Sequence, residues 1–274
     1  MLFSPVPVVV PIPNDQRNRT RLDRNKGDTS SGGITPEIVF VGNTAFSSEK
    51  LLEVLSNGWP RWFTASGRIN PTATHEAADG LTAFYYDNGF LNVSVDQPQI
   101  ASAADRVMIR INEGPLYRVG SIAIEGQLKF PRREVESQLT MRRGQLFRGS
   151  TLQRNALALE DFYSDRGFAY VNIDPRTEID SRRHLLNVRF LIKPGDEIRI
   201  DQITISGNTK TPEQVVRAAL RIHEHELYSA HALRESKARM DELGLFSDTH
   251  ITTEPSTRSD EINVRVTVVE KSKV

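Results

Sequence analysis

The chain has 274 residues and no cysteine, and its 35 Lys and Arg side chains balance its 35 Asp and Glu side chains. Zero net charge argues against a dedicated nucleic-acid-binding protein, which normally carries a marked basic excess. The lack of cysteine excludes a disulfide framework, a thiol nucleophile and a thiolate metal site.

Residues 1–36 are interpreted as a disordered leader or linker outside the folded part. Met1 to Ile12 is apolar, but its prolines and its lack of basic residues distinguish it from a secretory signal. The residues that follow are rich in Asn, Asp, Arg, Lys, Ser and Gly, a composition typical of disorder. No apolar run of roughly 18 residues occurs anywhere, so no segment has the composition of a membrane-spanning helix.

Residues 37–115 are predicted to form a first small domain with the element order β-α-α-β-β. Its long helix begins at Asn70–Pro71 and ends at Gly89, which is expected to adopt a positive φ as a left-handed cap. The second strand is predicted over Leu91–Gln97 and the last strand over 107–111.

Residues 116–195 repeat this order. The predicted elements are a strand over 117–125, a short helix after Pro131, a helix from Ser150 to Gly167, a strand over 168–174, a polar turn over 175–183 and a strand over 184–193.

Residues 196–271 form the third predicted domain. Thr211–Pro212 marks the start of its first helix, and Ser229 is the expected N-cap of its second helix, which Gly244 ends. The side chains expected to face the core are Val215, Val216, Ala219, Leu220, Leu233, Met240 and Leu243.

Three sets of landmarks recur in the same order along the chain. The helix-ending glycines are 78 and 77 residues apart, a period long enough for a small domain. Each domain closes at Glu113–Gly114, Pro194–Gly195 or Glu270–Lys271, and the first two of these are interpreted as turns between domains. The glycines to which we assign a structural role are Gly42, Gly89, Gly126, Gly167, Gly207 and Gly244.

The predicted fold class is α+β, with three tandem β-α-α-β-β domains, each a three-stranded mixed sheet covered on one face by two helices. The last two strands of each domain are joined by a short turn and must be antiparallel. The first strand returns through two helices and can pair in parallel with the last. The last strand is therefore expected at the centre and the second strand at an open edge.

These residues resemble POTRA domains, the periplasmic repeats of BamA-type outer-membrane protein assembly factors. The resemblance rests on the Gly–Asn turns at 42–43 and 207–208, the Gly–aromatic pair after the long helix, Glu113–Gly114, and the stretches 244–248 and 268–271. Gln127 departs from the Gly–Asn pattern in the middle domain. The three domains look most like the third, fourth and fifth POTRA domains of that family.

The resemblance implies a non-enzymatic scaffold, without cofactor or metal, in the periplasm at the outer membrane of a Gram-negative bacterium. The implied partners are unfolded outer-membrane β-barrel proteins, accessory lipoproteins of the assembly complex and periplasmic chaperones, with no nucleic acid. In that family a transmembrane barrel follows the last repeat. No series of amphipathic strands of about ten residues occurs here, so we expect a truncation, an incomplete reading frame or a barrel-less protein. The alternative is the POTRA region of a TamA-like or two-partner secretion transporter.

The resemblance also suggests where partners bind. Clients are expected to add a strand to the open edge of the first domain, at Leu91, Asn92, Val93, Ser94, Val95, Asp96 and Gln97. Lipoprotein docking would involve Arg217 and Glu224, which are seven residues apart and share one side if the helix continues. Both side chains are expected to be exposed, and a plain surface pair is the alternative.

Other candidate sites are weaker. No catalytic sequence motif occurs, and the densest titratable stretch, His223 to Glu226 with His231 nearby, is interpreted as a solvated connection. A metal site or a shallow enzyme site there is the remote alternative. Three aromatic residues between the first two helices are expected to fold back onto those helices rather than form an exposed contact site: Trp59, Trp62 and Phe63. A nucleic-acid-binding α+β unit is the last alternative, but it lacks the aromatic and basic strand pattern.

Overall fold

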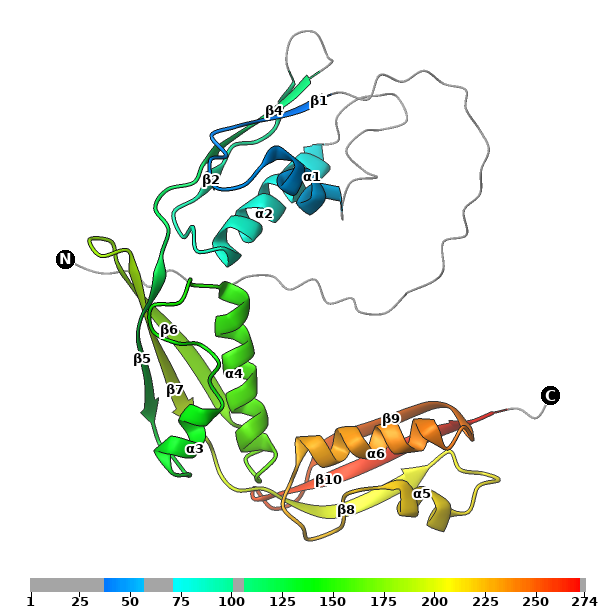
Figure 1. Cartoon of the computed structure of the whole chain (residues 1–274). Coiled ribbons are helices and arrows are strands. Elements are labelled where there is room, and N and C mark those ends of the chain that lie inside the picture. The colour runs from blue at the N-terminus through cyan, green and yellow to red at the C-terminus, as the bar shows by residue number, and fades with distance from the viewer. Residues whose placement is uncertain (1–36, 57–70, 101–105, 272–274) are drawn as a thin grey trace, which may run out of the picture. The chain divides into compact units, whose positions relative to one another are not determined.

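The computed structural model of the chain describes residues 37–56, 71–100 and 106–271. The interpretations of residues 1–36 and of Trp59, Trp62 and Phe63 concern residues outside these ranges. Among the described helices, none is both long and apolar enough to cross a membrane. The described residues form three sheets, one in each sequence repeat (Figure 1).

The first repeat contains β1 (Glu37–Val41), α1 (Ser48–Ser56), α2 (Pro71–Asp87), β2 (Ser94–Val95), β3 (Gln99–Ile100) and β4 (Arg106–Asn112). The strand expected over Leu91–Gln97 is shorter than predicted, because the chain still turns at its start, where Val93 N donates to Phe90 O at 3.3 Å. Pro98, which lacks an N–H, separates β2 from β3.

The second repeat contains β5 (Arg118–Gly126), α3 (Arg132–Ser137), α4 (Gly149–Ser164), β6 (Asn172–Asp180) and β7 (Leu185–Lys193). The predicted strand over 168–174 and turn over 175–183 are wrong, since β6 starts later and runs through Pro175. An edge strand tolerates proline where the missing N–H would face solvent. The turn is confined to the residues after Asp180, whose carboxylate accepts from Arg182 N at 3.1 Å and Arg183 N at 3.0 Å.

The third repeat contains β8 (Arg199–Ser206), α5 (Glu213–Ala219), α6 (Ala230–Glu242), β9 (Phe246–Pro255) and β10 (Glu261–Glu270). Ser229 caps α6 as predicted, with its hydroxyl accepting from Ala232 N at 3.1 Å. Two side chains expected in the core are instead exposed, Val215 by 37% and Leu243 by 41%.

The sheet orders confirm the predicted topology. They are β1-β4-β2, with β3 also on β4, then β5-β7-β6 and β8-β10-β9, so the last strand of each repeat is central. β1 and β8 are parallel to their central strands, whereas β2, β3 and β9 are antiparallel to theirs. The helices of each repeat lie on one face of its sheet (Figure 1).

The cores are made mainly of aliphatic side chains from the central strands and the long helices. Leu81, Tyr85 and Val107 are fully buried in the first repeat, and Val216, Met240 and Val266 in the third. Burying one such side chain stabilises the fold by roughly 1.5–3 kcal/mol. In the second repeat the largest fully buried side chains are Tyr117, Phe147, Tyr163 and Phe190.

The glycine after each first strand is required by close packing. A Cβ at Gly42, Gly126 or Gly207 would lie 2.1, 2.2 or 2.0 Å from a carbonyl oxygen of the central strand, and all three have positive φ. Any side chain there would collide with backbone, which explains why the landmark recurs.

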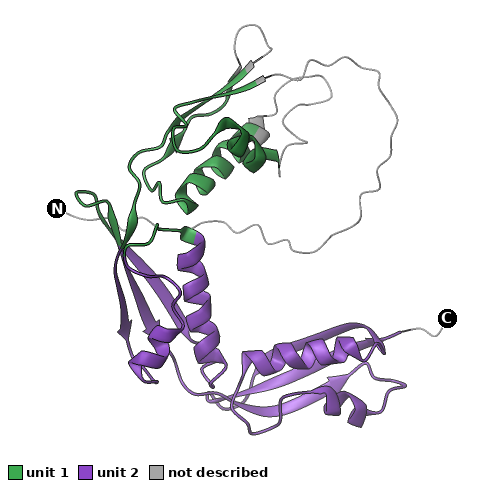
Figure 2. Cartoon of the chain, viewed as in Figure 1, with its two compact units in different colours: residues 1–119, 144–149, 178–186 green, residues 120–143, 150–177, 187–274 purple. Residues whose placement is uncertain are grey.

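Contacts divide the chain into two compact units, residues 1–119, 144–149 and 178–186, and residues 120–143, 150–177 and 187–274 (Figure 2). The start of the second repeat and the tip of its β6–β7 hairpin are grouped with the first repeat, and the rest of it with the third. Each unit is described separately below.

Candidate interaction surfaces

In the first unit, the glycine that ends α2 is also the point where the second repeat begins. Gly89 has a φ of 88°, as predicted, and its carbonyl accepts from Tyr117 N at 2.8 Å. A Cβ at Gly89 would lie 2.7 Å from Leu146 Cδ1. Glycine is therefore needed twice, for the helix end and for the approach of the next repeat.

The second unit contains the same joint. Gly167, with a φ of 98°, accepts from Ile198 N at 2.7 Å, and a Cβ there would lie 3.2 Å from Leu227 Cδ2. Asp165 strengthens the joint by accepting from His231 N at 2.6 Å. Arg234 lies 3.1 Å from the carboxylate of Asp161. The predicted positive φ of Gly244 is also confirmed, at 69°.

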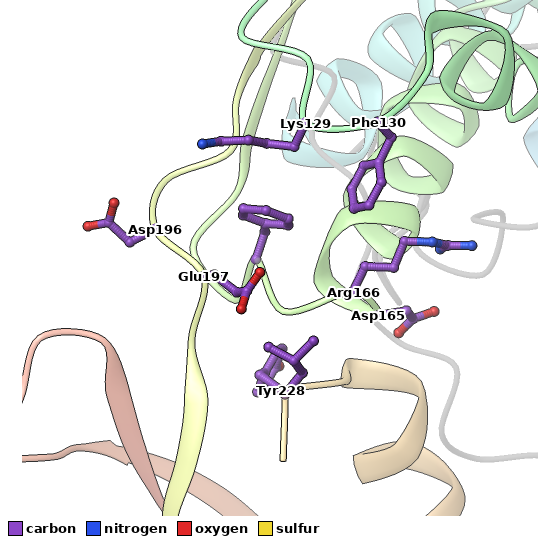
Figure 3. A pocket seen from close by; sticks show the side chains of 9 residues that line it. Lys129, Phe130, Asp165, Arg166, Asp196, Glu197 and Tyr228 are labelled. Carbon is purple, nitrogen blue, oxygen red and sulfur yellow. The ribbon is translucent and has the colours of Figure 1, made fainter. Parts of the chain in front are cut away.

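A pocket of about 620 Å³ lies at this second joint (Figure 3). Its labelled side chains come from the residues before α3, after α4, before β8 and before α6. Arg166 is occupied by packing, with its guanidinium 3.9 Å from the centre of the Phe162 ring and donating to Phe162 O at 2.8 Å. The residues that line it include no Ser, Thr or His.

The outer edge of the first strand in the third repeat is closed by the connection between α5 and α6. Tyr228 N donates to Ile198 O at 2.9 Å, Ile200 N to Glu226 O at 2.9 Å, and His225 N to Ile200 O at 2.6 Å. These bonds form a short antiparallel pairing along β8. No further strand can pair with β8 at these residues.

In the second repeat, the connection between α3 and α4 closes the outer edge of β5 in the same way. Val119 N donates to Gln145 O at 2.8 Å, Gly144 N to Val119 O at 2.8 Å, and Phe147 N to Tyr117 O at 3.2 Å. Among the described residues, the outer strands that have no such closing segment are therefore β1, β2, β3, β6 and β9.

Arg217 and Glu224 complete the closed edge of β8. Both side chains are exposed, as expected, and lie 3.8 Å apart. Arg217 Nη2 donates to Ile203 O at 3.2 Å, and Ile203 N donates to Glu224 Oε1 at 3.0 Å. The helix does not continue to Glu224, because α5 ends at Ala219. The pair binds the backbone and is more than a plain surface ion pair.

A groove of about 780 Å³ lies between α5 and α6. Val215 and Leu243, the two side chains wrongly expected in the core, line it together with Ala218, Arg239 and Glu242. The groove thus places two exposed aliphatic side chains beside charged ones.

The structure also reveals a glutamate latch that sequence reasoning missed. Glu113 is only 8% exposed, and its carboxylate accepts from Thr44 Oγ1, from Ala45 N at 2.9 Å and from Tyr85 OH at 2.9 Å. It ties the turn after β1 and the helix α2 to the end of β4. Burial, the hydrogen bond to Glu113 and the charge of Glu113 raise the pKa of Tyr85.

Glu270 forms the same latch in the third repeat. It accepts from Thr209 Oγ1 at 2.8 Å, Lys210 N at 2.9 Å and Thr211 N at 2.7 Å. Desolvation alone would raise its pKa, but these hydrogen bonds lower the pKa of Glu270 to about 2. The available sequence signal was the pairing of Gly–Asn–Thr turns with a closing glutamate.

The histidine-rich stretch does not gather into a metal centre. Across the described residues, no three His, Cys, Asp or Glu side chains are placed to hold an ion together. His223 Nδ1 lies 3.2 Å from Glu226, and both side chains are exposed. His225 has a φ of 69° and serves the closed edge through its backbone.

The family model for the surface antigen variable number repeat, POTRA, matches residues 36–114, 117–195 and 198–271. The outer membrane protein assembly factor BamA of Neisseria meningitidis serogroup B is 28% identical over 265 residues, which cover 93% of this chain and 33% of that protein. BamA of Nitratidesulfovibrio vulgaris is 25% identical over 228 residues, covering 81% and 29%. The chain thus spans about a third of the length of these relatives.

The crystal structure of POTRA domains 3–5 of Haemophilus influenzae BamA matches with a TM-score of 0.64 and 21% identity, covering 86% of this chain and 95% of that one. BamA of Haemophilus ducreyi lacking POTRA domains 1–3 matches with a TM-score of 0.53 and 21% identity, covering 57% and 30%. These matches concern the fold. The chain belongs to the POTRA family and consists of three tandem repeats of the kind found in BamA.

Proposed function

We propose that the three repeats form the periplasmic scaffold of an outer-membrane protein assembly factor, in which they bind unfolded β-barrel clients and accessory lipoproteins. The similarity to the N. meningitidis assembly factor over 93% of the chain carries this proposal. The scaffold is proposed to act at the outer membrane of a Gram-negative bacterium and to have no enzymatic activity. Periplasmic chaperones are proposed as further partners.

Client strands are proposed to pair with the open second-strand edges, including Leu91–Gln97. Backbone pairing tolerates many client sequences, which suits a scaffold with many clients. β2 offers two residues, whereas β9 offers ten without an internal proline. β9 is therefore the more extensive acceptor edge, and it lacks the Lys and Pro residues that commonly protect edges, except Pro255 at its end.

The central strand β10 determines which way the backbone groups of β9 point. The carbonyl oxygen of Val268 in β10 faces β8, since it lies 2.0 Å from where a Cβ of Gly207 would be. The backbone groups of successive strand residues point to alternate sides, so those of Val264 and Val266 face β8 as those of Val268 do, and they do not bond to β9. Their partners in β9 therefore direct their N–H groups to the open edge. Thr253 is one of them, and Thr252 is bonded inward.

Proline substitution separates the two roles of this strand. Thr253→Pro should abolish binding of a ten-residue outer-membrane strand peptide with little change in the midpoint of unfolding, and Thr253→Ala is the matched control. Thr252→Pro should unfold the β9–β10 pairing. Amide shifts of the wild-type chain during the titration decide between the edges: first shifts at Val95 favour β2, and first shifts at Thr253 favour β9. Shifts confined to the helices would contradict edge pairing.

Lipoprotein docking is proposed at Arg217, Glu224 and the adjoining groove between α5 and α6. Glu224→Lys would remove the acceptor of Ile203 N, so lower stability would obscure any loss of docking. Glu224→Gln keeps an acceptor oxygen and removes only the charge, and Val215→Ser removes apolar area from the groove. We expect both to weaken binding to the purified soluble form of the lipoprotein at nearly unchanged melting temperature. Undiminished binding of both variants would place docking elsewhere.

A further inference from the structure

The second repeat differs from its neighbours in charge. Residues 116–195 contain 14 Lys and Arg side chains and 9 Asp and Glu side chains. The first repeat, residues 37–115, contains 5 and 9 of these, and the third repeat, residues 196–271, contains 10 and 14. The zero net charge of the whole chain therefore conceals a basic repeat that lies between two acidic ones in the sequence.

Arginines gather at the end of the second repeat where β5 begins. The residues before α4 run antiparallel to this strand, and Phe147 N donates to Tyr117 O at 3.2 Å, so Arg148 lies opposite Leu116. Tyr117 and Phe147 are buried in the core. Side chains at alternate positions point the other way, and Arg118, Arg148 and Leu116 accordingly lie exposed on the outer face.

The tip of the β6–β7 hairpin brings more arginines to this end. Arg118 N donates to His184 O at 3.0 Å, which places the tip beside the start of β5 in the first unit (Figure 2). Among the described residues, neither the Arg148 nor the Arg182 side chain forms an ion pair. We call the four exposed side chains at this end the arginine surface: Arg118, Arg148, Arg182 and Arg183.

The third repeat builds the same end with its charges neutralised. Arg199 N donates to Asp260 O at 3.0 Å, the equivalent of the bond between Arg118 and His184. Glu197 stands where the second repeat has Leu116, and it lies 3.5 Å from Arg199. Arg258 at the hairpin tip lies 3.0 Å from Asp260. The fold therefore does not require unpaired arginines at this end.

We propose that the arginine surface binds the phosphate headgroups of a membrane that contains anionic lipid. Guanidinium groups bind phosphate oxygens through paired hydrogen bonds, and clusters of basic side chains attract anionic headgroups. Two acidic side chains reduce this positive charge without cancelling it. They are Asp180, 3.9 Å from Arg183, and Asp87, whose Oδ1 lies 3.9 Å from where a Cβ of Gly149 would be.

A membrane fits this surface better than an acidic polypeptide does. A polypeptide commonly binds by adding a strand to an open edge, but residues 144–147 already occupy the edge of β5 here. Exposed Leu116 lies opposite Arg148, and an aliphatic side chain beside arginine suits the boundary between headgroups and acyl chains. The proposed function places such a membrane nearby. The inference rests on that location and not on the binding of clients or lipoproteins.

Co-sedimentation of the full chain with vesicles tests the proposal. We expect binding to vesicles of equal parts phosphatidylcholine and phosphatidylglycerol, and none to vesicles of phosphatidylcholine alone. Concentrated sodium chloride should weaken the binding, because exposed charges are screened by salt. Equal binding to both kinds of vesicle would overturn the proposal. Binding to polyglutamate but not to the mixed vesicles would also overturn it, since the partner would then be an acidic polypeptide.

Two double variants locate the binding. Arg148→Gln with Arg182→Gln should weaken binding to the mixed vesicles by about thirtyfold, which corresponds to about 1 kcal/mol for each arginine. Arg133→Gln with Arg189→Gln removes the same charge from exposed positions elsewhere in the second repeat, and binding should be nearly unchanged. All four side chains are exposed, so the melting temperature, measured alongside, should stay the same.

Two outcomes of this comparison would overturn the proposal. An equal loss of binding in the two double variants would mean that only net charge matters. Undiminished binding in the first variant would place the lipid contact elsewhere in the chain, such as residues 1–36, which contain five Lys and Arg side chains.

Discussion

The three repeats hold the same turn by different means. In the first repeat the turn has both the glutamate latch and Phe46, whose ring centre lies 5.1 Å from that of Tyr85. The second repeat keeps the aromatic contact, with Phe130 at 5.2 Å from Tyr163, but has Pro194 in place of the glutamate. The third keeps only the glutamate, since Thr211 stands where the phenylalanine would be.

This comparison shows that a hydrogen-bonded carboxylate and an aromatic cluster can each fix the turn between the first strand and the first helix. The two solutions respond differently to conditions. Aromatic packing depends on apolar area and carries no charge, whereas the latch depends on an ionised carboxylate. Stability in acid should therefore differ between repeats that share one fold.

The largest effect is expected from Glu113→Ala. The change leaves Ala45 N and Tyr85 OH without their acceptor in a mostly buried place, so the free energy of unfolding should fall by about 3 kcal/mol. Denaturant titration measures this loss, and Glu113→Gln, which keeps one acceptor oxygen, should show a smaller one. A loss below about 1 kcal/mol would mean that Phe46 holds the turn without the latch.

Gly167→Val extends the comparison from the turn to the joint between repeats. Both a φ of 98° and contact with Leu227 oppose a side chain there, and we expect a loss of about 2 kcal/mol. Gly244 has a φ of 69°, but no described atom would lie within 4 Å of a Cβ added there, so Gly244→Val should cost only about 1 kcal/mol. Equal losses in the two variants would show that contact with the next repeat is unimportant.

Phe130→Ala tests how much aromatic packing stabilises the turn of the second repeat. Phe130 is half-buried against Tyr163 and Phe168, and its removal should destabilise the second repeat by about 1.5 kcal/mol. Combining it with Pro194→Glu should restore part of the loss, if the two solutions are interchangeable. Amide exchange in β5 and α3 reports the second repeat separately.

The sequence predicted the features that depend on local conformation and on chain order. Glycine positions predicted the positive φ of Gly89, Gly167 and Gly244, and the lengths of the connections predicted the central position of the last strand. The extent of the edge strands was not predictable in the same way. Pro98 interrupts an edge, whereas Pro175 lies within one, because the effect of a proline depends on the direction in which its missing N–H would point.

Interactions between residues far apart in the sequence were the other feature that could not be predicted. Glu113 and Thr44 are 69 residues apart, and the sequence alone suggested only a turn at Glu113–Gly114. Arg217 and Glu224 were correctly expected to be exposed, but their bonds to Ile203 depend on how the connection between α5 and α6 runs along β8. The clearest sequence hint that the turn interacts with the residue closing the repeat lies in the second repeat. There, Gln127 and Pro194 both depart from the pattern.

The smallest effect is expected from acid. Folding lowers the pKa of Glu270 from 4.5 to about 2, so its latch contributes full stability above pH 4.5 and loses it as pH falls from 4.5 towards 2. Amide exchange of Lys210 and Thr211, measured between pH 5 and pH 2.5 and corrected for the intrinsic exchange rate, should show protection falling over this range. Glu270→Gln should remove that pH dependence, and the Lys129 amide of the second repeat, which has no latch, should not show it. Parallel loss of protection at Lys129 and Lys210 would mean that acid unfolds the repeats together, and the difference in latch chemistry would then have no consequence for stability.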